Sequence, residues 1–255
     1  MKVKFLGCGA GFNPSYGSNS AYLMTRDDGM ILLECGEQTF ARLINLPDFL
    51  KAKYLTVLLS HTHSDHAGSL GNMVMYSYNV LHRRVVIVAG GIKQRREIRR
   101  LLKGFGVARE CYQIVTTWGM SHSSCIHDIA LRDSCINVEM IRTHHAPSLA
   151  CYNIELSRLA EGGQVDGLFW SGDTNDGVPA IVRALWGYSV YQEAGVRHSS
   201  AHVQIHQFDR TLVAIAEHGN VSAQQLRRNI TLMHLDGRRA LYYSEVLGYQ
   251  TPELV

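Results

Sequence analysis

An apolar run that ends in a cluster of histidines constrains this chain more than any other sequence feature. Residues 54–60 (YLTVLLS) are almost continuously apolar, which is typical of a strand covered on both faces. The run leads directly into an H-x-H-x-D-H pattern formed by His61, His63, Asp65 and His66. Imidazole nitrogens and carboxylate oxygens suit zinc and similar divalent ions, and a short turn can direct the first two histidines to one ion and the remaining pair to a second. The pattern predicts a metal site at the end of a buried strand.

A solvated loop or a helix cap is the simpler interpretation of the same segment. Ser64 and Asp65 are both good capping residues for a helix that follows. Clustered histidines have no capping purpose, however, so the metal site is the favoured prediction.

The spacing of apolar residues predicts a mixed α/β chain. We expect strands at residues 1–6, 21–25, 30–34, 54–60, 85–88, 136–141, 151–156 and 167–170, with a hairpin around Asp27-Asp28-Gly29. We expect helices at residues 70–81, 98–105, 178–185, 208–217 and 238–246. This order favours two sheets with helices on the outside. A chain of 255 residues is long enough for one large domain, and we expect a single domain over residues 1–255.

Composition limits the class of protein. Hydrophobic residues make up 46% of the chain and charged residues 18%, close to the average of globular proteins. We find no secretory signal and no apolar stretch of the roughly 18 residues that a membrane span needs, so we expect a cytoplasmic protein without membrane insertion. The six cysteines form no CxxC pair, and reduced thiols are expected. A net charge of +3 is too small to indicate a nucleic-acid-binding protein.

The HTHSDHAG segment resembles the signature of the metallo-β-lactamase superfamily, whose fold is an αββα sandwich with the site at one edge. Residues 142–147 (RTHHAP) resemble its third-histidine motif, in which His145 matches better than His144. Residues 171–174 (SGDT) and 233–236 (MHLD) resemble the segments that carry a bridging aspartate and the last histidine. The resemblance implies two divalent ions, zinc by default or manganese. Their implied ligands are His61, His63 and His145 for the first ion and Asp65, His66 and His234 for the second, with Asp173 bridging.

Residues 33–36 (LECG) resemble a strand end of this superfamily that usually reads aspartate-cysteine-glycine. Glu34 stands where the superfamily has the aspartate. A metal-binding histidine needs an acceptor for its second ring N–H, and we expect Glu34 to orient one with its longer side chain. The alternative is a glutamate exposed at the end of a strand.

Two neighbouring ions can activate water and stabilise both the attacking and the leaving oxygen, so the resemblance implies hydrolysis. The bridging carboxylate and the complete second site resemble the phosphoesterase version of the pattern, in which Asp65 also orients the nucleophile. A phosphodiester further needs a proton for its leaving oxygen.

Residues 191–193 (YQE) and 200–203 (SAHV) resemble the acidic residue and histidine that act together in phosphodiesterases of the superfamily. The resemblance implies that His202 is the general acid and Glu193 its orienting partner. His206 and His218 are nearby alternatives for the acid.

Several segments also resemble the anti-Pycsar cyclic nucleotide phosphodiesterases of phages and some bacteria, namely VKFLGCGAGFNP, GSNSAY, GSLGNMVMYSYNV, YQE and MHLD. This resemblance implies hydrolysis of 3′,5′-cyclic mononucleotides to 5′-monophosphates, which would defeat cyclic-nucleotide anti-phage signalling. It also implies a homodimer. Met75 and Tyr76, outside the apolar stripe of their helix, are candidates for the dimer surface.

Two other functions fit parts of the pattern. A tRNA 3′-processing endoribonuclease resembles the chain through the same ligands, but the interval from His145 to Asp173 is too short for its basic RNA-gripping arm. The basic stretch at residues 93–103 (KQRREIRRLLK) is an RNA-contact candidate that is better explained as a solvated helix face, so RNA is the less favoured substrate. A catalytically inactive nucleotide-binding protein is disfavoured by the complete ligand set.

Overall fold

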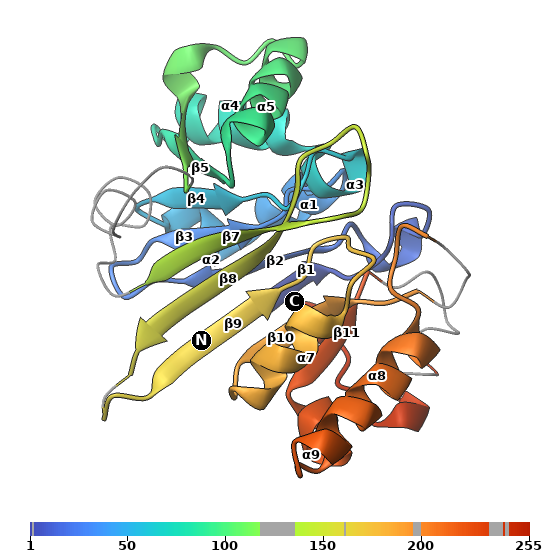
Figure 1. Cartoon of the computed structure of the whole chain (residues 1–255). Coiled ribbons are helices and arrows are strands. Elements are labelled where there is room, and N and C mark those ends of the chain that lie inside the picture. The colour runs from blue at the N-terminus through green and yellow to red at the C-terminus, as the bar shows by residue number, and fades with distance from the viewer. Residues whose placement is uncertain (2, 118–135, 161, 196–199, 235–241, 243–244) are drawn as a thin grey trace.

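Strands buried on both faces build two stacked sheets with helices on the outer sides, as Figure 1 shows in a computed structural model. The structure describes residues 1, 3–117, 136–160, 162–195, 200–234, 242 and 245–255. The first sheet has the order β1-β2-β3-β4-β5-β6 and consists of β1 (Lys4–Gly7), β2 (Ser20–Met24), β3 (Met30–Leu33), β4 (Leu55–Leu58), β5 (Val85–Ala89) and β6 (Tyr112–Thr116). The second has the order β11-β10-β9-β8-β7 and consists of β7 (Asn137–Thr143), β8 (Cys151–Leu159), β9 (Val165–Trp170), β10 (Ser189–Glu193) and β11 (Ile230–Met233).

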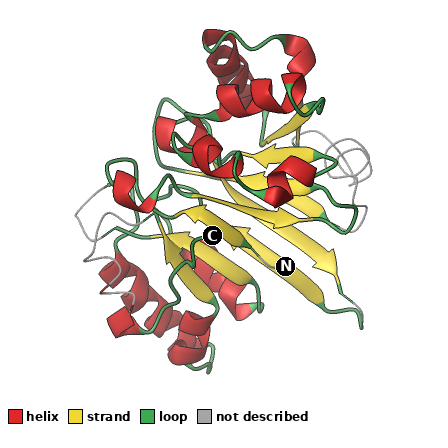
Figure 2. Cartoon of the chain, turned by 180° about the vertical axis from the view of Figure 1, so that it is seen from behind, coloured by secondary structure: helices red, strands yellow, loops and turns green. Residues whose placement is uncertain are grey.

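Helices cover the outer face of each sheet, which Figure 2 shows from behind. The first sheet carries α1 (Thr39–Leu43), α2 (Pro47–Lys51), α4 (Leu70–Asn79) and α5 (Ile92–Gly104), and the second carries α7 (Val178–Leu185), α8 (Ile205–His218) and α9 (Ala223–Arg228). The short helix α3 (Ser64–Ala67) follows β4 at the end of the first sheet, and 3-10 turns form at η1 (Pro14–Tyr16) and η2 (Arg109–Cys111). The αββα sandwich predicted from the sequence is confirmed.

The β4 strand shows why its sequence is continuously apolar. Leu58 packs in the core between the sheets, whereas Leu55 and Val57 pack in the second core beneath the outer helices. Both faces are therefore dry, and a polar residue on either face would have to be buried. The strand ends at the cluster of histidines.

The predicted hairpin is present, since β2 and β3 pair antiparallel and Asp28 adopts a positive φ of 60° in the turn. Strands β6, β10 and β11 were not predicted from the sequence. They are short segments of five, five and four residues, and polar residues interrupt the apolar pattern in β6 and β10. Helix α5 begins at Ile92, earlier than expected. The prediction followed apolar residues, and the first turns of the helix are mostly basic. The predicted helix at 238–246 falls largely outside the described residues.

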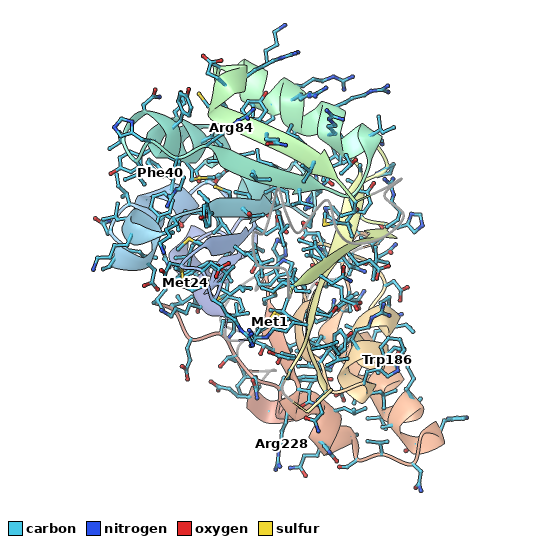
Figure 3. All side chains as sticks on the ribbon, turned by 90° about the vertical axis from the view of Figure 1, so that its left-hand side faces the viewer. Met1, Met24, Phe40, Arg84, Trp186 and Arg228 are labelled. Carbon is cyan, nitrogen blue, oxygen red and sulfur yellow. The ribbon has the colours of Figure 1, made fainter. Side chains whose placement is uncertain are left out.

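The exposure of side chains bears on two further expectations, the dimer surface at Met75 and Tyr76 and the basic stretch at residues 93–103. Met75 and Tyr76 are only partly exposed, and the Tyr76 ring packs against Phe40 with ring centroids 5.4 Å apart. Helix α5 buries Ile98 and Leu102, and its basic side chains extend outward from the upper end of the molecule in Figure 3. Both interpretations of the basic stretch, the solvated face and the RNA contact, require this exposure, so the preference for the solvated face stays a prediction.

The thiols of Cys8, Cys35, Cys111 and Cys151 are free and buried, and Cys125 and Cys135 lie outside the described residues. Among the described helices, none combines the length and apolarity needed to cross a bilayer.

Candidate metal centre

The ligand candidates all follow the carboxyl ends of strands. His61 and His63 follow β4, His145 follows β7, Asp173 follows β9, and His234 follows β11. Strands β9, β10 and β11 run parallel, and β7 shares their direction through the antiparallel β8. Residues after parallel strands collect at one edge of a sheet, which is where open α/β sheets bind ligands.

The H-x-H-x-D-H segment turns directly into a short helix. His63 is the N-cap of α3, and no side chain makes a capping hydrogen bond there. The side chains of Asp65 and His66 instead point to the neighbouring histidines and carboxylates. The capping interpretation of Ser64 and Asp65 is therefore wrong for this structure.

Two glycines allow the loops around the centre to come this close. A Cβ on Gly36 would lie 1.9 Å from the carbonyl oxygen of Asp65, so the end of β3 touches the backbone of α3. Gly172 has a φ of +57°, and a Cβ there would lie 2.4 Å from the Cβ of Ser60. At Gly36 any side chain would clash with the backbone of α3. At Gly172 a side chain would clash with Ser60, and the positive φ also favours glycine.

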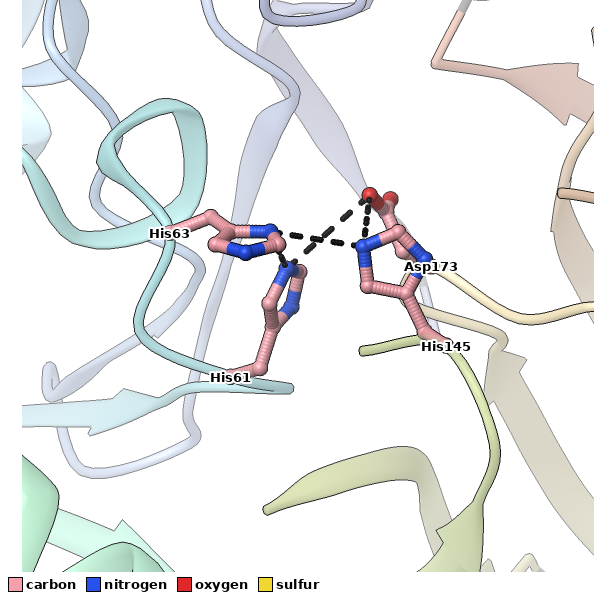
Figure 4. A group of neighbouring side chains, drawn as sticks. All are labelled: His61, His63, His145 and Asp173. Carbon is pink, nitrogen blue, oxygen red and sulfur yellow. Dashed lines mark hydrogen bonds and ion pairs between the residues drawn. The ribbon is translucent and has the colours of Figure 1, made fainter. Parts of the chain in front are cut away.

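The first group of converging side chains, drawn in Figure 4, consists of His61, His63, His145 and Asp173. The Nε2 atom of His61 lies 2.9 Å from Nδ1 of His63, and Nε2 of His145 lies 3.3 Å from the same atom. The Oδ2 atom of Asp173 lies 3.4 Å from Nε2 of His145 and 3.9 Å from Nε2 of His61. Ring nitrogens and a carboxylate oxygen thus face one common point.

The second group consists of Asp65, His66, Asp173 and His234. The Oδ1 atom of Asp173 lies 3.1 Å from Nε2 of His66 and 3.3 Å from Nε2 of His234. The Oδ2 atom of Asp65 lies 3.4 Å and 3.1 Å from the same two nitrogens. The two groups therefore share Asp173, which presents one oxygen to each.

Glu193 and His202 lie against this pair of groups. The Oε2 atom of Glu193 is 2.7 Å from Nδ1 of His202 and 3.4 Å from Nδ1 of His234. Its Oε1 atom accepts hydrogen bonds from the backbone N–H of Thr174 at 3.0 Å and of Val203 at 3.3 Å. A fully buried carboxylate with this many partners holds both imidazoles in fixed orientations. His202 itself is partly exposed, with 29% of its side chain accessible.

The structure discriminates between neighbouring histidines. His145 belongs to the first group, whereas His144 is exposed and uses its carbonyl oxygen to accept from the N–H of Asn175. His206 and His218 are both exposed on α8, and the Nδ1 atom of His218 lies 2.9 Å from the carbonyl oxygen of Ala214. Neither belongs to the groups of possible ligands found in the described part of the chain.

Glu34 is fully buried, so the alternative of an exposed strand-end glutamate is wrong. Its two carboxylate oxygens accept from the backbone N–H of Ser60 at 3.2 Å and 3.1 Å, and Oε1 lies 3.4 Å from Nδ1 of His66. Glu34 has a φ of 63°, an uncommon conformation for a residue with a side chain. The contact to His66 is the one that an orienting acceptor makes.

Two further orienting groups were missed by the sequence reasoning. The Oγ atom of Ser60 lies 3.0 Å from Nδ1 of His61, and the carbonyl oxygen of Ala201 lies 3.0 Å from Nδ1 of His145. Each leaves the Nε2 atom of its histidine facing the centre. Ser60 had a usable signal, because it directly precedes the first histidine, but a backbone carbonyl has no signature in a sequence.

Burial and charge act in opposite directions on the titration of the centre. Burial lowers the pKa of His66, but Asp173, Glu34 and Asp65 outweigh it and raise that pKa well above its ordinary value. The same competition, again won by carboxylates, raises the pKa of His234 to about 10. Burial raises the pKa of the Asp173 carboxyl, yet the imidazoles of His234 and His66 hold it well below its ordinary range. Positive charge is therefore favoured at the second group, where a divalent cation supplies it while the imidazoles stay neutral. In the first group, burial and the neighbouring imidazoles lower the pKa of His61 and of His63, which keeps these ligands unprotonated.

Two buried atoms without hydrogen bonds also indicate that the donor set suits divalent ions. Nε2 of His66 and Oδ1 of Asp173 are buried, and neither makes a hydrogen bond within the described part of the chain. Buried polar atoms normally have a hydrogen-bond partner, and a cation bound between these two atoms would supply the missing interaction. Mixed nitrogen and oxygen donors suit zinc and also manganese.

Sequence comparisons relate the chain to phage and bacterial proteins. The Anti-Pycsar protein Apyc1 of Bacillus phage BSP38 is 22% identical over 194 residues, 68% of each chain. The probable metallo-hydrolase YhfI of Bacillus subtilis is 35% identical over 72 residues, which span 28% of this chain and 28% of YhfI.

Solved structures show the same fold. The metallo-β-lactamase fold protein YhfI from Bacillus subtilis superposes with a TM-score of 0.67 at 14% identity, covering 99% of this chain and 95% of YhfI. The short form of human tRNase Z gives 0.64 at 16% identity, covering 100% and 97%. Zn²⁺-bound PqqB from Methylobacterium extorquens gives 0.65 at 11% identity, covering 100% and 98%.

A family-level match extends over nearly the whole sequence and includes every ligand candidate. The profile of the family described as Anti-Pycsar protein Apyc1 matches residues 1–245. With its metallo-β-lactamase fold, the chain belongs to the Anti-Pycsar protein Apyc1 family.

Proposed function

We propose that this chain is a dinuclear metal-dependent phosphodiesterase that hydrolyses 3′,5′-cyclic mononucleotides to 5′-monophosphates. Family membership and fold support a metal-dependent hydrolase. The observation that carries the phosphodiesterase reaction is the 2.7 Å contact between Glu193 and His202, placed beside the carboxylate that both ligand groups share. We treat residues 1–255 as one hydrolase domain.

The proposed ligands follow from the two groups of converging side chains. His61, His63 and His145 would hold the first ion, Asp65, His66 and His234 would hold the second, and Asp173, which belongs to both groups, would serve both. When bound, two such ions polarise the phosphoryl oxygens and activate water for in-line attack. Zinc is the proposed metal, with manganese as the alternative.

Asp65 and His202 have different roles on the two sides of the phosphorus. Asp65 keeps its carboxylate at the centre, held by His234, where it can accept a hydrogen bond from the attacking water. Burial lowers the pKa of His202, but the hydrogen bond to Glu193 outweighs it and raises that pKa above its ordinary value, which favours the protonated imidazole that a general acid requires. Since Nδ1 faces Glu193, the Nε2 proton is the one available to the leaving 3′ oxygen. The oxygen of the attacking water forms the new bond to phosphorus and releases a proton, the P–O3′ bond breaks, O3′ takes the proton of His202, and the phosphate remains on O5′.

The biological setting that we propose rests on the family to which the chain belongs. The curated relatives named Anti-Pycsar protein Apyc1 come from Bacillus phages. We infer that the protein acts in the cytoplasm of a bacterial or phage-infected host cell, as a homodimer, and removes a cyclic nucleotide signal of anti-phage defence.

The test is a product assay on the purified protein with zinc or manganese added. The substrates are the four 3′,5′-cyclic mononucleotides and a tRNA precursor, and products are separated by chromatography. We expect 5′-monophosphates and intact RNA, with turnover lost on chelation. RNA cleavage alone would move the assignment to the tRNA 3′-processing endoribonucleases. Chelator-resistant binding without turnover would identify a nucleotide-sequestering protein.

A further inference from the structure

A cavity of about 280 Å³ lies beside the proposed general acid. His202 forms part of its wall, and the same imidazole has its ring centroid 4.8 Å from that of His145 and 5.5 Å from that of His234. Asn175, two residues after the shared Asp173, also lines the cavity. The cavity therefore begins one side chain away from the two ligand groups.

The loop after β9 and the start of α8 enclose this space. The Nδ2 atom of Asn175 donates to the carbonyl oxygen of Ser200 at 3.3 Å, which joins the two segments at the rim. At the base, a Cβ on Gly177 would lie 2.4 Å from the ring of Phe208, so the backbone of the loop rests directly on that ring. Phe208 is 2% exposed and is anchored in the core, which gives the cavity a rigid floor.

The lining suits a heterocycle and not a phosphate. On its inner side lie Ile181, Val203 and Phe208, each at most 6% exposed, whereas the rim carries amides and a hydroxyl from Asn175, Gln207 and Thr211. No lysine or arginine is among the described residues that line it, and Asp176 adds a carboxylate. Among these described lining residues, His202 alone could offer a cation to an anionic ligand. A flat, uncharged ring with hydrogen-bonding edges matches both parts.

The size and position of the cavity further restrict the class of ligand that it can bind. Pockets for whole small molecules hold roughly 300–1,000 Å³, so this cavity fits one ring system of a larger substrate. In the proposed reaction His202 faces O3′, and in a cyclic nucleotide O3′ and the base are carried by the same ribose. With the phosphate at the ligand groups and O3′ at His202, the base extends toward the far side of His202.

We propose that this cavity is the nucleobase subsite, with the edge of the base hydrogen-bonded by the rim amides of Asn175 and Gln207. The assignment rests on the proposed cyclic nucleotide function. It makes the loop after β9, residues 171–177, both the carrier of the shared carboxylate and the entrance of the base.

The experiment fills the cavity from the solvent side. Gln207 is exposed on α8, so Gln207→Trp places bulk at the mouth without disturbing the core. Ala214→Trp is the matched control, because Ala214 is exposed on the same helix and does not line the cavity. Each variant is assayed on the four cyclic mononucleotides and on methyl ribofuranoside 3,5-cyclic phosphate. This compound keeps the reacting ring and lacks a base.

For Gln207→Trp, we expect kcat/KM on the nucleotides, relative to that on the base-free substrate, to fall by roughly tenfold or more, mainly through KM. Gln207→Ala should shift the same ratio by a smaller factor, and Ala214→Trp should leave it at the wild-type value. An unchanged ratio in Gln207→Trp would overturn the subsite alone, as would an equal loss on both kinds of substrate. A wild-type protein that turns over no cyclic mononucleotide would instead remove the proposed function, and the subsite with it.

Discussion

Replacing Glu34 with glutamine should weaken metal binding while leaving the fold nearly intact. The carboxylate accepts from the N–H of Ser60 through both oxygens, and Oε1 lies 3.4 Å from Nδ1 of His66. As an acceptor, it holds the proton of His66 on Nδ1 and leaves Nε2 free to bind a metal. A glutamine has the same size and keeps one oxygen for Ser60, so its amide nitrogen turns toward His66. That nitrogen donates, which favours the tautomer with the proton on Nε2 and blocks metal binding.

The magnitude follows from the kind of contact that is lost. Removing a group that orients a metal ligand typically costs about 10- to 100-fold in metal affinity, or about 1.4–2.7 kcal/mol. Because the Ser60 N–H keeps an acceptor, the free energy of unfolding of the metal-free protein should fall by less than the ~1–3 kcal/mol of an abandoned buried donor. Metal binding is thus affected more than stability.

The assay is zinc titration against a competing chelator, combined with thermal unfolding of the metal-free protein. The matched control is Glu155→Gln, which changes another buried carboxylate, one that accepts from the Nε atom of Arg183 at 3.0 Å and belongs to neither ligand group. Wild-type zinc affinity in Glu34→Gln would refute the orienting role. A large loss of stability with unchanged affinity would show that Glu34 matters only for holding Ser60.

Other perturbations test separate parts of the structure. His61→Ala should lose bound metal and activity together, whereas His202→Ala should keep the metal, by elemental analysis, and lose about 10²- to 10⁴-fold in kcat; a His202 variant at full rate would contradict the acid assignment. Burial raises the pKa of the Cys35 thiol to about 12, so this cysteine should resist alkylation in the native protein and react only after unfolding, as mass spectrometry of labelled peptides would show. The hydrogen bond from Lys4 holds the pKa of Asp48 below its ordinary value of 3.8, so its contribution to stability is present above that value and is lost as pH falls through the lower, folded-state pKa. The difference in urea-unfolding free energy between wild type and Asp48→Asn should therefore shrink as the solution is acidified below that value, and a constant difference would contradict the pairing.

The local part of the site was readable from the sequence. The H-x-H-x-D-H segment lies within one turn after a strand, and a run such as Leu55–Leu58 is buried on both faces wherever it occurs. Both features depend on contacts between residues close in the chain, so spacing and residue type were enough to predict a strand and a ligand cluster there. The likeness to known families, and not spacing, supplied the remaining ligands.

Tertiary structure alone decided how the distant residues meet. Asp65 and His234 are separated by 169 positions, yet Nε2 of His234 lies 3.1 Å from Oδ2 of Asp65. Such a contact depends on the order and direction of strands in two sheets, and two of those strands, β10 and β11, were not predicted from the sequence.

The sequence by itself thus determined the strand, the histidine cluster and the chemistry of its donors, because these rest on local spacing and on the properties of single side chains. The structure decided that Asp173 presents one oxygen to each ligand group, that Glu193 contacts both His202 and His234, and that a cavity opens beside His202. Those features arise from atoms that belong to different strands and loops, including backbone N–H groups and carbonyl oxygens that every residue carries. Their positions are set only when the two sheets pack against each other.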